Sequence, residues 1–464
     1  MTGQHDPPRH LFTLLPGDIP HTAKRELLQQ VDCLVDWRPL HEKVRPFFAE
    51  NGRPSIDPVV MVKMMLAGYL LGIPSDRRLV EECTDSFALR EFLGYQLDEK
   101  LPTHPNFTNW RKRLGAEFFR GLLHDVVRQL VDQGLELSTA RSVDATSVKA
   151  QASKHGPVVQ RPAEVAVEDF VAGYFAEDPA GSGDQPPPAP EAVGATVPLN
   201  RHEPQARLQR KGGEVAEFRF QASFCADVAT GLITDAVATP LEQAATALAH
   251  VEHDPLPVTE VVADGKYDAG ATLGALQARG VTTYVPQGHH DKAAQLSKDE
   301  FRYQPEADSY LCPAGQMLKH SRFDPHKQLH FYTARASDCR GCPRKAECTP
   351  AKRRVVTRTA TEGGREGAVR AGPRYCELQR ARRVHEHLHM LGKRDHNLRR
   401  ARSLGLEALG IQVALTAIAI DLKKALRQLG ASGLDSFLRW LAGSRRVRGY
   451  PAWTRVRPLT RGAF

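Results

Sequence analysis

The hydrophobic pattern of residues 1–138 predicts helices throughout. Pro58 suits the first turn of an apolar helix, and two further helices are predicted between Ser75 and Gly94. Apolar residues at helical spacing between residues 118 and 130 predict another helix. It is preceded by a short helix with three successive basic residues, Arg111, Lys112 and Arg113. This arrangement is compatible with helix-turn-helix DNA binding and equally with a plain helical bundle.

From residue 140 the pattern changes to the two-residue period of strands. Residues 141–148 predict a strand with Asp144 in its middle, and Thr230-Gly231 predicts the turn of a hairpin. A segment rich in Pro, Gly and Ala, 177–198, is predicted to be a disordered linker. Further strands are predicted at 217–228, 232–239, 260–264 and 281–286, with helices at 241–253 and 271–279. This order predicts an α/β protein whose mixed sheet carries helices on its faces.

Residues 301–350 break the α/β pattern and contain four of the eight cysteines. Helical spacing returns from Arg374 to Lys393, and a long apolar helix is predicted from Leu404 to Leu429, ending at Gly430. These changes divide the chain into five segments. They are a helical domain at 1–138, the first part of the core at 139–300, a cysteine-bearing insertion at 301–350, the helical end of the core at 351–440 and a basic tail at 441–464.

Composition favours a globular, cytoplasmic protein. The chain has 464 residues, of which 41% are hydrophobic and 25% charged, as is ordinary for a folded soluble protein. Its first 20 residues show no signal-peptide pattern, and the apolar stretch 59–73 is shorter than a membrane span and contains Lys63. The cysteines do not suggest a secreted disulfide framework on a chain of this length. We therefore expect no membrane association.

Basic residues are concentrated in the C-terminal third of the chain. The formal net charge is +9, and residues 319–402 contain 22 Lys or Arg against 8 Asp or Glu. Most of these basic residues are arginines, whose planar guanidinium groups suit contacts with phosphate oxygens. A run of charged residues is also typical of a solvent-exposed surface that binds no partner. The predominance of arginine favours a nucleic acid as partner.

Three acidic residues are candidates for metal-dependent chemistry. Asp144 lies inside a predicted strand, where a charge is disfavoured unless it has a partner or a function, and Asp264 ends another strand. Glu386 lies on a predicted helix whose same face carries Arg382, His389 and Lys393. Converging carboxylates can hold two divalent cations that organise phosphodiester cleavage. Each acid, taken alone, could equally be a salt-bridged surface residue.

The insertion contains a cluster of cysteines with metal-ligand spacing. A C-x2-C pair and two further cysteines fit tetrahedral zinc binding by thiolates. Four reduced thiols without a metal are the alternative. We refer to these residues as the four-cysteine cluster: Cys312, Cys339, Cys342 and Cys348.

The same helix as Glu386 contains a competing motif. Residues 385–389 read His-Glu-His-Leu-His and satisfy H-E-x-x-H, the helix signature of zinc metalloproteases. In that reading His385 and His389 would bind zinc, and Glu386 would be the general base. The arginines on this helix disfavour it, because a positive field repels a cation.

Several segments, in order along the chain, resemble DDE-type transposases of bacterial insertion sequences. The resemblance is to the insertion-sequence four/five-like superfamily, in its branch with a helical N-terminal domain, and it covers the chain except the linker and the ends. It includes Leu66–Ile73, Ser75–Leu79 and Pro105–Leu114, the segments Val143–Thr146 and Ala150–Ser153 around the first acid, Val261–Asp268 around the second, and Leu398–Arg402 with Gly405. Glu386, with Arg382 four residues before it and Lys393 seven after it, resembles the family's Tyr-Arg-Glu-Lys signature.

The resemblance implies an RNase H-like catalytic core that cuts and rejoins DNA. Its catalytic residues would be Asp144, Asp264 and Glu386, holding two Mg²⁺ or Mn²⁺ ions, with double-stranded DNA (terminal inverted repeats and target) as partner. It further implies a homodimer on DNA, associated with the nucleoid. The expected DNA-contacting residues are Arg382, Lys393, Arg111, Lys112, Arg113, Arg399 and Arg400.

Two departures from the family pattern bear on activity. Gln379 stands at the tyrosine position of the signature, and Asp264-Gly265-Lys266-Tyr267 replaces the usual Asp-Lys-Gly-Tyr. Both leave the three carboxylates in place. Because of the two departures, an inactive DNA-binding remnant of a transposase is a third alternative, beside the active enzyme and the metalloprotease. The three intact acids argue against it.

Overall fold

The chain folds into two compact units, seen in a computed structural model. Unit 1 comprises residues 1–258 and 380–464, and unit 2 comprises residues 259–379. Among the described residues, no helix is long and apolar enough to cross a membrane. The structure describes residues 22–49, 55–152, 158–162, 165, 169–170, 196–210, 215–240, 244–287, 296, 298–325, 329–359 and 361–444.

The N-terminal part of unit 1 is helical, as predicted. Its elements are α1 (Ala23–Leu34), α2 (Pro39–Val44), η1 (Arg45–Phe47), α3 (Pro58–Leu70), α4 (Asp76–Asp85), α5 (Phe87–Leu93) and α6 (His104–Asp132). The side chains of Asp57 and Ser75 cap α3 and α4. Gly94 ends α5 in the left-handed conformation, with φ of 78°. Gly115 bends α6 with φ of 75°, so the two helices predicted on either side of it follow each other directly.

A sheet centred on β5 (Glu217–Asp227) follows. This strand is antiparallel to β1 (Ala140–Lys149) along one edge, and to β4 (Arg207–Gln209) and β6 (Ile233–Thr239) along the other. Gly231, with φ of 66°, lies in the predicted turn between β5 and β6. A separate hairpin pairs β2 (Val158–Pro162) with β3 (Thr196–Asn200).

Two differences from the sequence predictions concern unit 1. Residues 196–198, predicted as the end of a disordered linker, belong to β3, whose backbone pairs with β2; the rest of the linker lies outside the described residues. The final helix, α15 (Leu406–Ser444), continues through Gly430, because one glycine weakens a helix without ending it. The basic tail beyond residue 444 lies outside the described residues.

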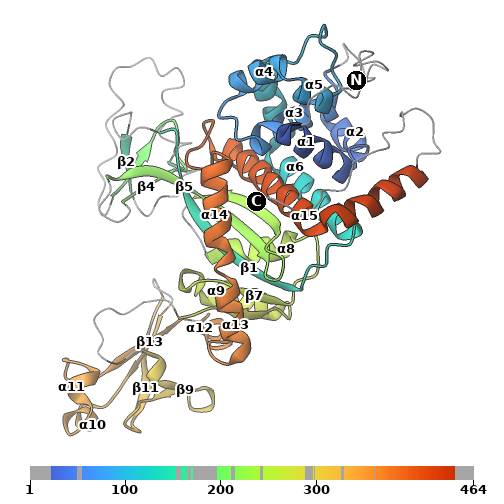
Figure 1. Cartoon of the computed structure of the whole chain (residues 1–464). Coiled ribbons are helices and arrows are strands. Elements are labelled where there is room, and N and C mark those ends of the chain that lie inside the picture. The colour runs from blue at the N-terminus through green and yellow to red at the C-terminus, as the bar shows by residue number, and fades with distance from the viewer. Residues whose placement is uncertain are drawn as a thin grey trace. The chain divides into compact units, whose positions relative to one another are not determined.

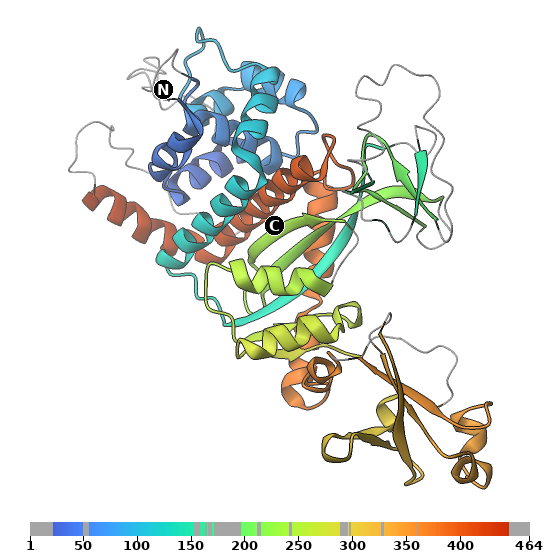
Figure 2. The same cartoon turned by 180° about the vertical axis from the view of Figure 1, so that it is seen from behind.

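Helices cover both faces of this sheet. In Figure 1, α14 (Val384–Asp395) lies in front of the sheet, whereas α8 (Ala244–His253) lies in front in Figure 2, the view from behind. The helix α15 packs against α6, α3 and β6. One hydrophobic core therefore runs from the N-terminal helices through the sheet, with Leu28, Phe224 and Leu415 among its members. The helical region does not have a core of its own.

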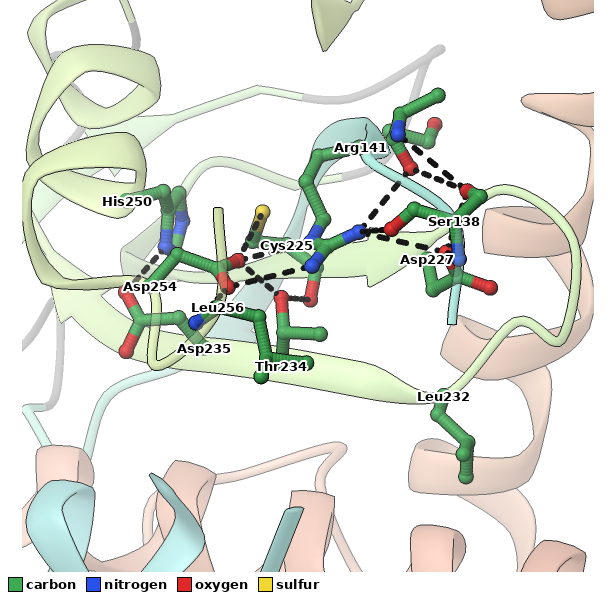
Figure 3. Close-up of polar contacts among 12 residues, drawn as sticks. Ser138, Arg141, Cys225, Asp227, Leu232, Thr234, Asp235, His250, Asp254 and Leu256 are labelled. Atoms are coloured by element: carbon green, nitrogen blue, oxygen red, sulfur yellow. Dashed lines mark hydrogen bonds and ion pairs between the residues drawn. The ribbon is translucent and has the colours of Figure 1, made fainter. Parts of the chain in front are cut away.

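Several charged groups buried beside the sheet are paired with one another. The guanidinium of Arg141, which is 0% exposed, contacts Asp254 at 2.9 Å and Asp227 at 3.3 Å (Figure 3). Asp235, also buried, binds His250 at 2.7 Å, and His250 in turn contacts Ser223 at 2.8 Å. Such pairing offsets the cost of removing charges from water. These contacts join β1, β5, β6 and α8.

Unit 2 contains a parallel strand pair and a small second sheet. The pair is β7 (Glu260–Val262) and β8 (Thr282–Tyr284), with η2 (Gly265–Tyr267) and α9 (Gly270–Ala278) between them. The second sheet has the antiparallel order β13-β12-β11-β10-β9. Its strands are β9 (Arg302–Gln304), β10 (Ser309–Leu311), β11 (Met317–Asp324), β12 (Leu329–Thr333) and β13 (Val355–Thr359); the remaining elements of the unit are η3 (Lys298–Glu300), η4 (Pro305–Ala307), α10 (Ala336–Arg340), α11 (Lys345–Cys348), α12 (Glu362–Glu366) and α13 (Pro373–Ala381).

The small sheet has its own core and extends past the segment that the sequence suggested. Tyr310, Leu318 and Tyr332 are buried together in it. Its edge strand β13 reaches Thr359, nine residues beyond the boundary placed at 350, because β13 pairs with β12 along its whole length. The cysteine-bearing segment is thus one folded sheet with two short helices.

Candidate active site along β1 and α14

Two polar contacts fix α14 along β1. The Nε2 atom of His385 donates to the carbonyl oxygen of Ser142 at 3.0 Å, and Lys393 Nζ donates to Thr146 Oγ1 at 2.6 Å. Eight residues of helix rise about 12 Å, and four residues of strand span about 13 Å, so the two spacings match. The two elements therefore run in the same direction, and Asp144 lies midway between the contacts.

The side chain of Asp144 lies on the sheet face covered by α14. Asp144 is paired in register with Phe224, whose ring centroid is 5.8 Å from that of His389 on α14. Cross-strand partners project to the same face of a sheet, so Asp144 projects with Phe224. The carboxylate is half-buried; its Oδ1 accepts the Ala145 backbone N–H at 2.8 Å, and its Oδ2 lies 3.4 Å from Arg382 Nη1.

Arg382 reaches Asp144 from a turn. The sequence predicted one helix from Arg374 to Lys393, with Arg382 on the same helical face as Glu386. The structure instead ends α13 at Ala381 and begins α14 at Val384. Arg382 lies in the break between the two helices, and its side chain pairs with Asp144. Helical spacing continues across the break, which is why the pattern gave no sign of it.

Glu386 lies in the first turn of α14 and is exposed, whereas its neighbour His385 is buried. About 100° of helix separates the two side chains, which explains the contrast. Burial lowers the pKa of His385 to about 3, despite the hydrogen bond to Ser142 that favours the charged form, so the ring is neutral at physiological pH.

This arrangement argues against the metalloprotease. A zinc-binding histidine on such a helix must offer a ring nitrogen to the metal. The Nε2 atom of His385 is committed to the Ser142 carbonyl, and its Nδ1 atom is buried. Its ring centroid is 5.6 Å from that of His389. The match to H-E-x-x-H therefore arises by chance. The two histidines pack within unit 1, and Glu386 happens to stand between them in the sequence.

Asp264 belongs to unit 2 and caps η2. It is half-buried, and its Oδ1 accepts the Lys266 backbone N–H at 2.9 Å. Gln379, the residue at the tyrosine position of the signature, supports the backbone next to it. The amide of Gln379 donates to the carbonyl oxygens of Ala263 at 3.3 Å and Tyr284 at 3.1 Å. The departure from the signature therefore provides a contact that holds the strand end before Asp264.

A metal site is not preformed. Among the described residues, no group of three or more His, Cys, Asp or Glu side chains is arranged to hold a metal ion. Asp144 and Glu386 are on facing elements of unit 1, and Asp264 is in unit 2. Their carboxylate oxygens are the donors that magnesium prefers.

Two exposed arginines follow α14. Residues 399–401 continue beside β1: Lys149 N donates to the Arg399 carbonyl and Ala401 N donates to the Lys149 carbonyl, at 3.1 and 2.8 Å. The Gln412 amide donates to the Arg400 carbonyl at 3.1 Å. The backbone is therefore held, while the side chains of Arg399 and Arg400 are exposed. This is the arrangement expected of phosphate-contacting residues.

The basic residues predicted on α6 are not equivalent. Arg111 contacts Asp76 through two nitrogens, at 2.6 and 2.7 Å, and its side chain is 12% exposed. An internal carboxylate thus pairs with its guanidinium, and a DNA contact at Arg111 stays a prediction. Lys112 and Arg113 are exposed, and Arg113 lies over the ring of Phe48 at 4.6 Å.

The sequence analysis overlooked Thr146. Its hydroxyl receives Lys393 and so fixes the far end of α14 beside Asp144. The two-residue period of strands places Thr146 on the same face as Asp144, and this signal was available in the sequence.

Comparisons with known proteins give two matches to family models. Residues 19–113 match a family described as "Transposase domain (DUF772)", and residues 311–426 match one described as "Transposase DDE domain". The chain carries both domains of a DDE-type transposase of insertion-sequence type. Transposases of this type are DNA-cleaving enzymes, and DNA is therefore the partner. Glu386 lies within the second match, whereas Asp144 and Asp264 precede it.

Among solved structures, the chain is similar to a piggyBac transposase in a "synaptic complex with hairpin DNA", determined by cryo-electron microscopy. The identity is 10% and the TM-score 0.32, and the alignment covers 92% of this chain and 82% of that one.

Proposed function

We propose that the chain catalyses metal-dependent cleavage and strand transfer of DNA, with Asp144, Asp264 and Glu386 as a carboxylate triad on an RNase H-like core. The observation that carries the proposal is the fixing of α14 along β1. Contacts at Ser142 and Thr146 hold the helix that bears Glu386 over the strand that bears Asp144. The match to a transposase DDE domain supports the same assignment.

The three carboxylates would hold two magnesium ions, with manganese as a substitute. When bound, such ions activate the attacking oxygen and stabilise the leaving oxygen of a phosphodiester. The residues of the chain orient the reactants. Arg382, 3.4 Å from Asp144, can exchange this carboxylate for a DNA phosphate, and Lys393 lies in the last turn of α14. Gln379 is a positioning residue, because it holds the backbone before Asp264.

The substrate would be double-stranded DNA. Water first cleaves a phosphodiester at the element's end and leaves a 3′-hydroxyl, which then attacks a phosphodiester of the target and releases a new 3′-hydroxyl there. Arg399, Arg400, Lys112 and Arg113 are exposed and suited to backbone phosphates. We further propose that the enzyme acts as a homodimer on paired terminal inverted repeats, in the cytoplasm at the nucleoid.

Nicking of a duplex that carries the inverted repeat flanking the reading frame tests the triad. We expect Asp144→Asn, Asp264→Asn and Glu386→Gln each to reduce magnesium-dependent nicking by at least about 100-fold. Binding of the same duplex should change little. The matched control is His385→Gln, which retains an amide donor for the Ser142 carbonyl and should nick at nearly the wild-type rate.

Localised oxidation tests whether the three residues share one site. Ferrous iron replaces magnesium, and ascorbate with peroxide then cleaves the polypeptide next to the bound metal. Backbone cuts near all three positions, each competed by magnesium, are expected. Cuts near only one of the three, or zinc-dependent peptide hydrolysis that His385→Gln abolishes, would contradict the proposal.

A further inference from the structure

The four-cysteine cluster lines a single pocket in unit 2. All four side chains border it, together with apolar residues that include Phe301 and Leu318. Cys312 comes from the turn between β10 and β11, whereas the other three come from the segment that carries α10 and α11. Each is half-buried, and none forms a disulfide. Residues 27 or more positions apart in the sequence thus meet at one place.

The turn at Cys312 directs one backbone N–H toward the sulfur. The Gln316 backbone N–H donates to Cys312 Sγ at 3.2 Å, while Gly315 N donates to the Cys312 carbonyl at 2.8 Å. Gly315 has φ of 78°, which a side chain would disfavour. An amide that donates to sulfur stabilises a thiolate more than a thiol, because the thiolate is the stronger acceptor. The turn therefore presents one amide donor to the Cys312 sulfur.

The segment that carries the other three cysteines is built from two very short helices. The helices α10 and α11 are five and four residues long, and neither has a buried residue. Helices this short are not stable by themselves in water. Two of the segment's cysteines, Cys339 and Cys348, pack against the core of the small sheet. Whatever binds these sulfurs therefore fixes the segment.

Four sulfurs at one place need a cation to ionise together. The guanidinium of Arg354 lines the same pocket. Arg354 is committed to the carbonyl oxygens of Cys348 and Leu296, at 3.2 and 3.1 Å. A divalent ion with a preference for thiolates reverses the repulsion among the sulfurs.

We propose that the four-cysteine cluster binds one zinc ion in tetrahedral geometry, and that this ion fastens α10 and α11 to the small sheet. The described sulfurs are not yet spaced as in a metal site. Binding therefore draws the segment of α10 and α11 toward Cys312 and releases thiol protons. The ion is structural, because four protein ligands leave no open position for a substrate.

Metal content of the full-length protein, purified without chelators, tests this proposal. We expect one zinc per chain, and we expect cobalt substitution to produce the sulfur-to-metal charge-transfer absorption of a tetrahedral thiolate site. Cys312→Ser and Cys339→Ser should each lower zinc retention at least 10-fold. The matched control is Cys376→Ser, which removes an exposed thiol elsewhere in unit 2 and should leave the zinc in place.

A second measurement does not depend on folding of the variants. Titration of the wild-type protein with an organomercurial should release one zinc ion for every four cluster thiols that are modified. Absence of both zinc and the cobalt absorption, a disulfide between Cys339 and Cys342, or equal zinc loss in Cys376→Ser would overturn the proposal. These readouts use no DNA, so they are independent of the proposed cleavage activity.

Discussion

Asp235 shows how a single carboxylate joins distant parts of unit 1. Its carboxylate accepts two hydrogen bonds from Arg120, at 2.7 and 2.6 Å. It also binds the rings of His124 at 2.8 Å and His250 at 2.7 Å. Burial by itself would raise the pKa of Asp235, but these donors together hold it well below the ordinary value. The carboxylate is therefore ionised at neutral pH and neutralises the guanidinium of Arg120.

We predict that Asp235→Asn lowers the free energy of unfolding by about 3–5 kcal/mol, because it leaves the buried Arg120 without a counter-charge. Urea denaturation at pH 7 measures this change. The control is Glu81→Gln, which removes a carboxylate that is 63% exposed and paired with Arg78, and should cost less than about 1 kcal/mol. Equal effects of the two substitutions would contradict the pairing argument.

His385 should make unit 1 sensitive to acid. Its pKa is about 3 when folded and near 6.5 when unfolded, so below pH 6.5 the unfolded chain binds a proton that the folded chain does not. Stability is thus unaffected above pH 6.5 and falls as the pH decreases. We predict a loss on the order of 2–3 kcal/mol between pH 6.5 and 4.5 from this residue. Denaturation of His385→Gln over the same range should show a shallower decline than wild type.

At the scale of elements, local signals in the sequence were sufficient for most helices and strands. The turn at Gly231 and the helix ends at Ser75 and Gly94 were predicted correctly, because caps and turns depend on neighbouring residues. The break before Val384 was missed, since apolar and charged residues keep helical spacing across it. The hairpin of β2 and β3 was missed because its partner strands are far apart in the sequence.

The candidate site was predictable only in part. The sequence predicted Asp144 and Glu386 as candidates and a helix reaching Lys393, but the contacts that fix this helix involve the backbone of Ser142 and the hydroxyl of Thr146. Pairing between segments more than 200 residues apart leaves no trace in one sequence. Arg111 illustrates the same limit, because nothing local indicated its pairing with Asp76.

Two adjacent glycines in α12 provide a test of packing in unit 2. A methyl group on Gly364 would collide with the backbone of Gly270 and Gly274 on α9, whereas one on Gly363 would meet nothing within 4 Å. We predict that Gly364→Ala lowers the free energy of unfolding by at least about 1–3 kcal/mol. Gly363→Ala should be neutral or stabilise by up to about 1 kcal/mol, since alanine is the better helix former. Thermal unfolding of both variants measures these changes. We expect the melting temperature to fall in Gly364→Ala and to stay or rise in Gly363→Ala.

For the whole molecule, the net charge of +9 should appear as salt-dependent binding of DNA. We predict that Arg399→Ala and Arg400→Ala each reduce the slope of log affinity against log salt concentration by about 0.9, with little dependence on DNA sequence. Titration of a labelled duplex at several salt concentrations measures this slope. Arg78→Ala is the control, because Arg78 is already paired with Glu81 and Glu82. An unchanged slope in the Arg399 and Arg400 variants would remove them from the DNA interface.

The core shared by α3 and α15 has a consequence for biosynthesis. Nearly every residue of α3 is buried, and part of its cover is α15, which begins 336 residues after α3 ends. A ribosome needs roughly 20 to 70 seconds to translate that interval. During this time the apolar surface of α3 leaves the exit tunnel without its final neighbour. Nascent chains of this protein should therefore bind chaperones at residues 58–70 until the ribosome has passed α15.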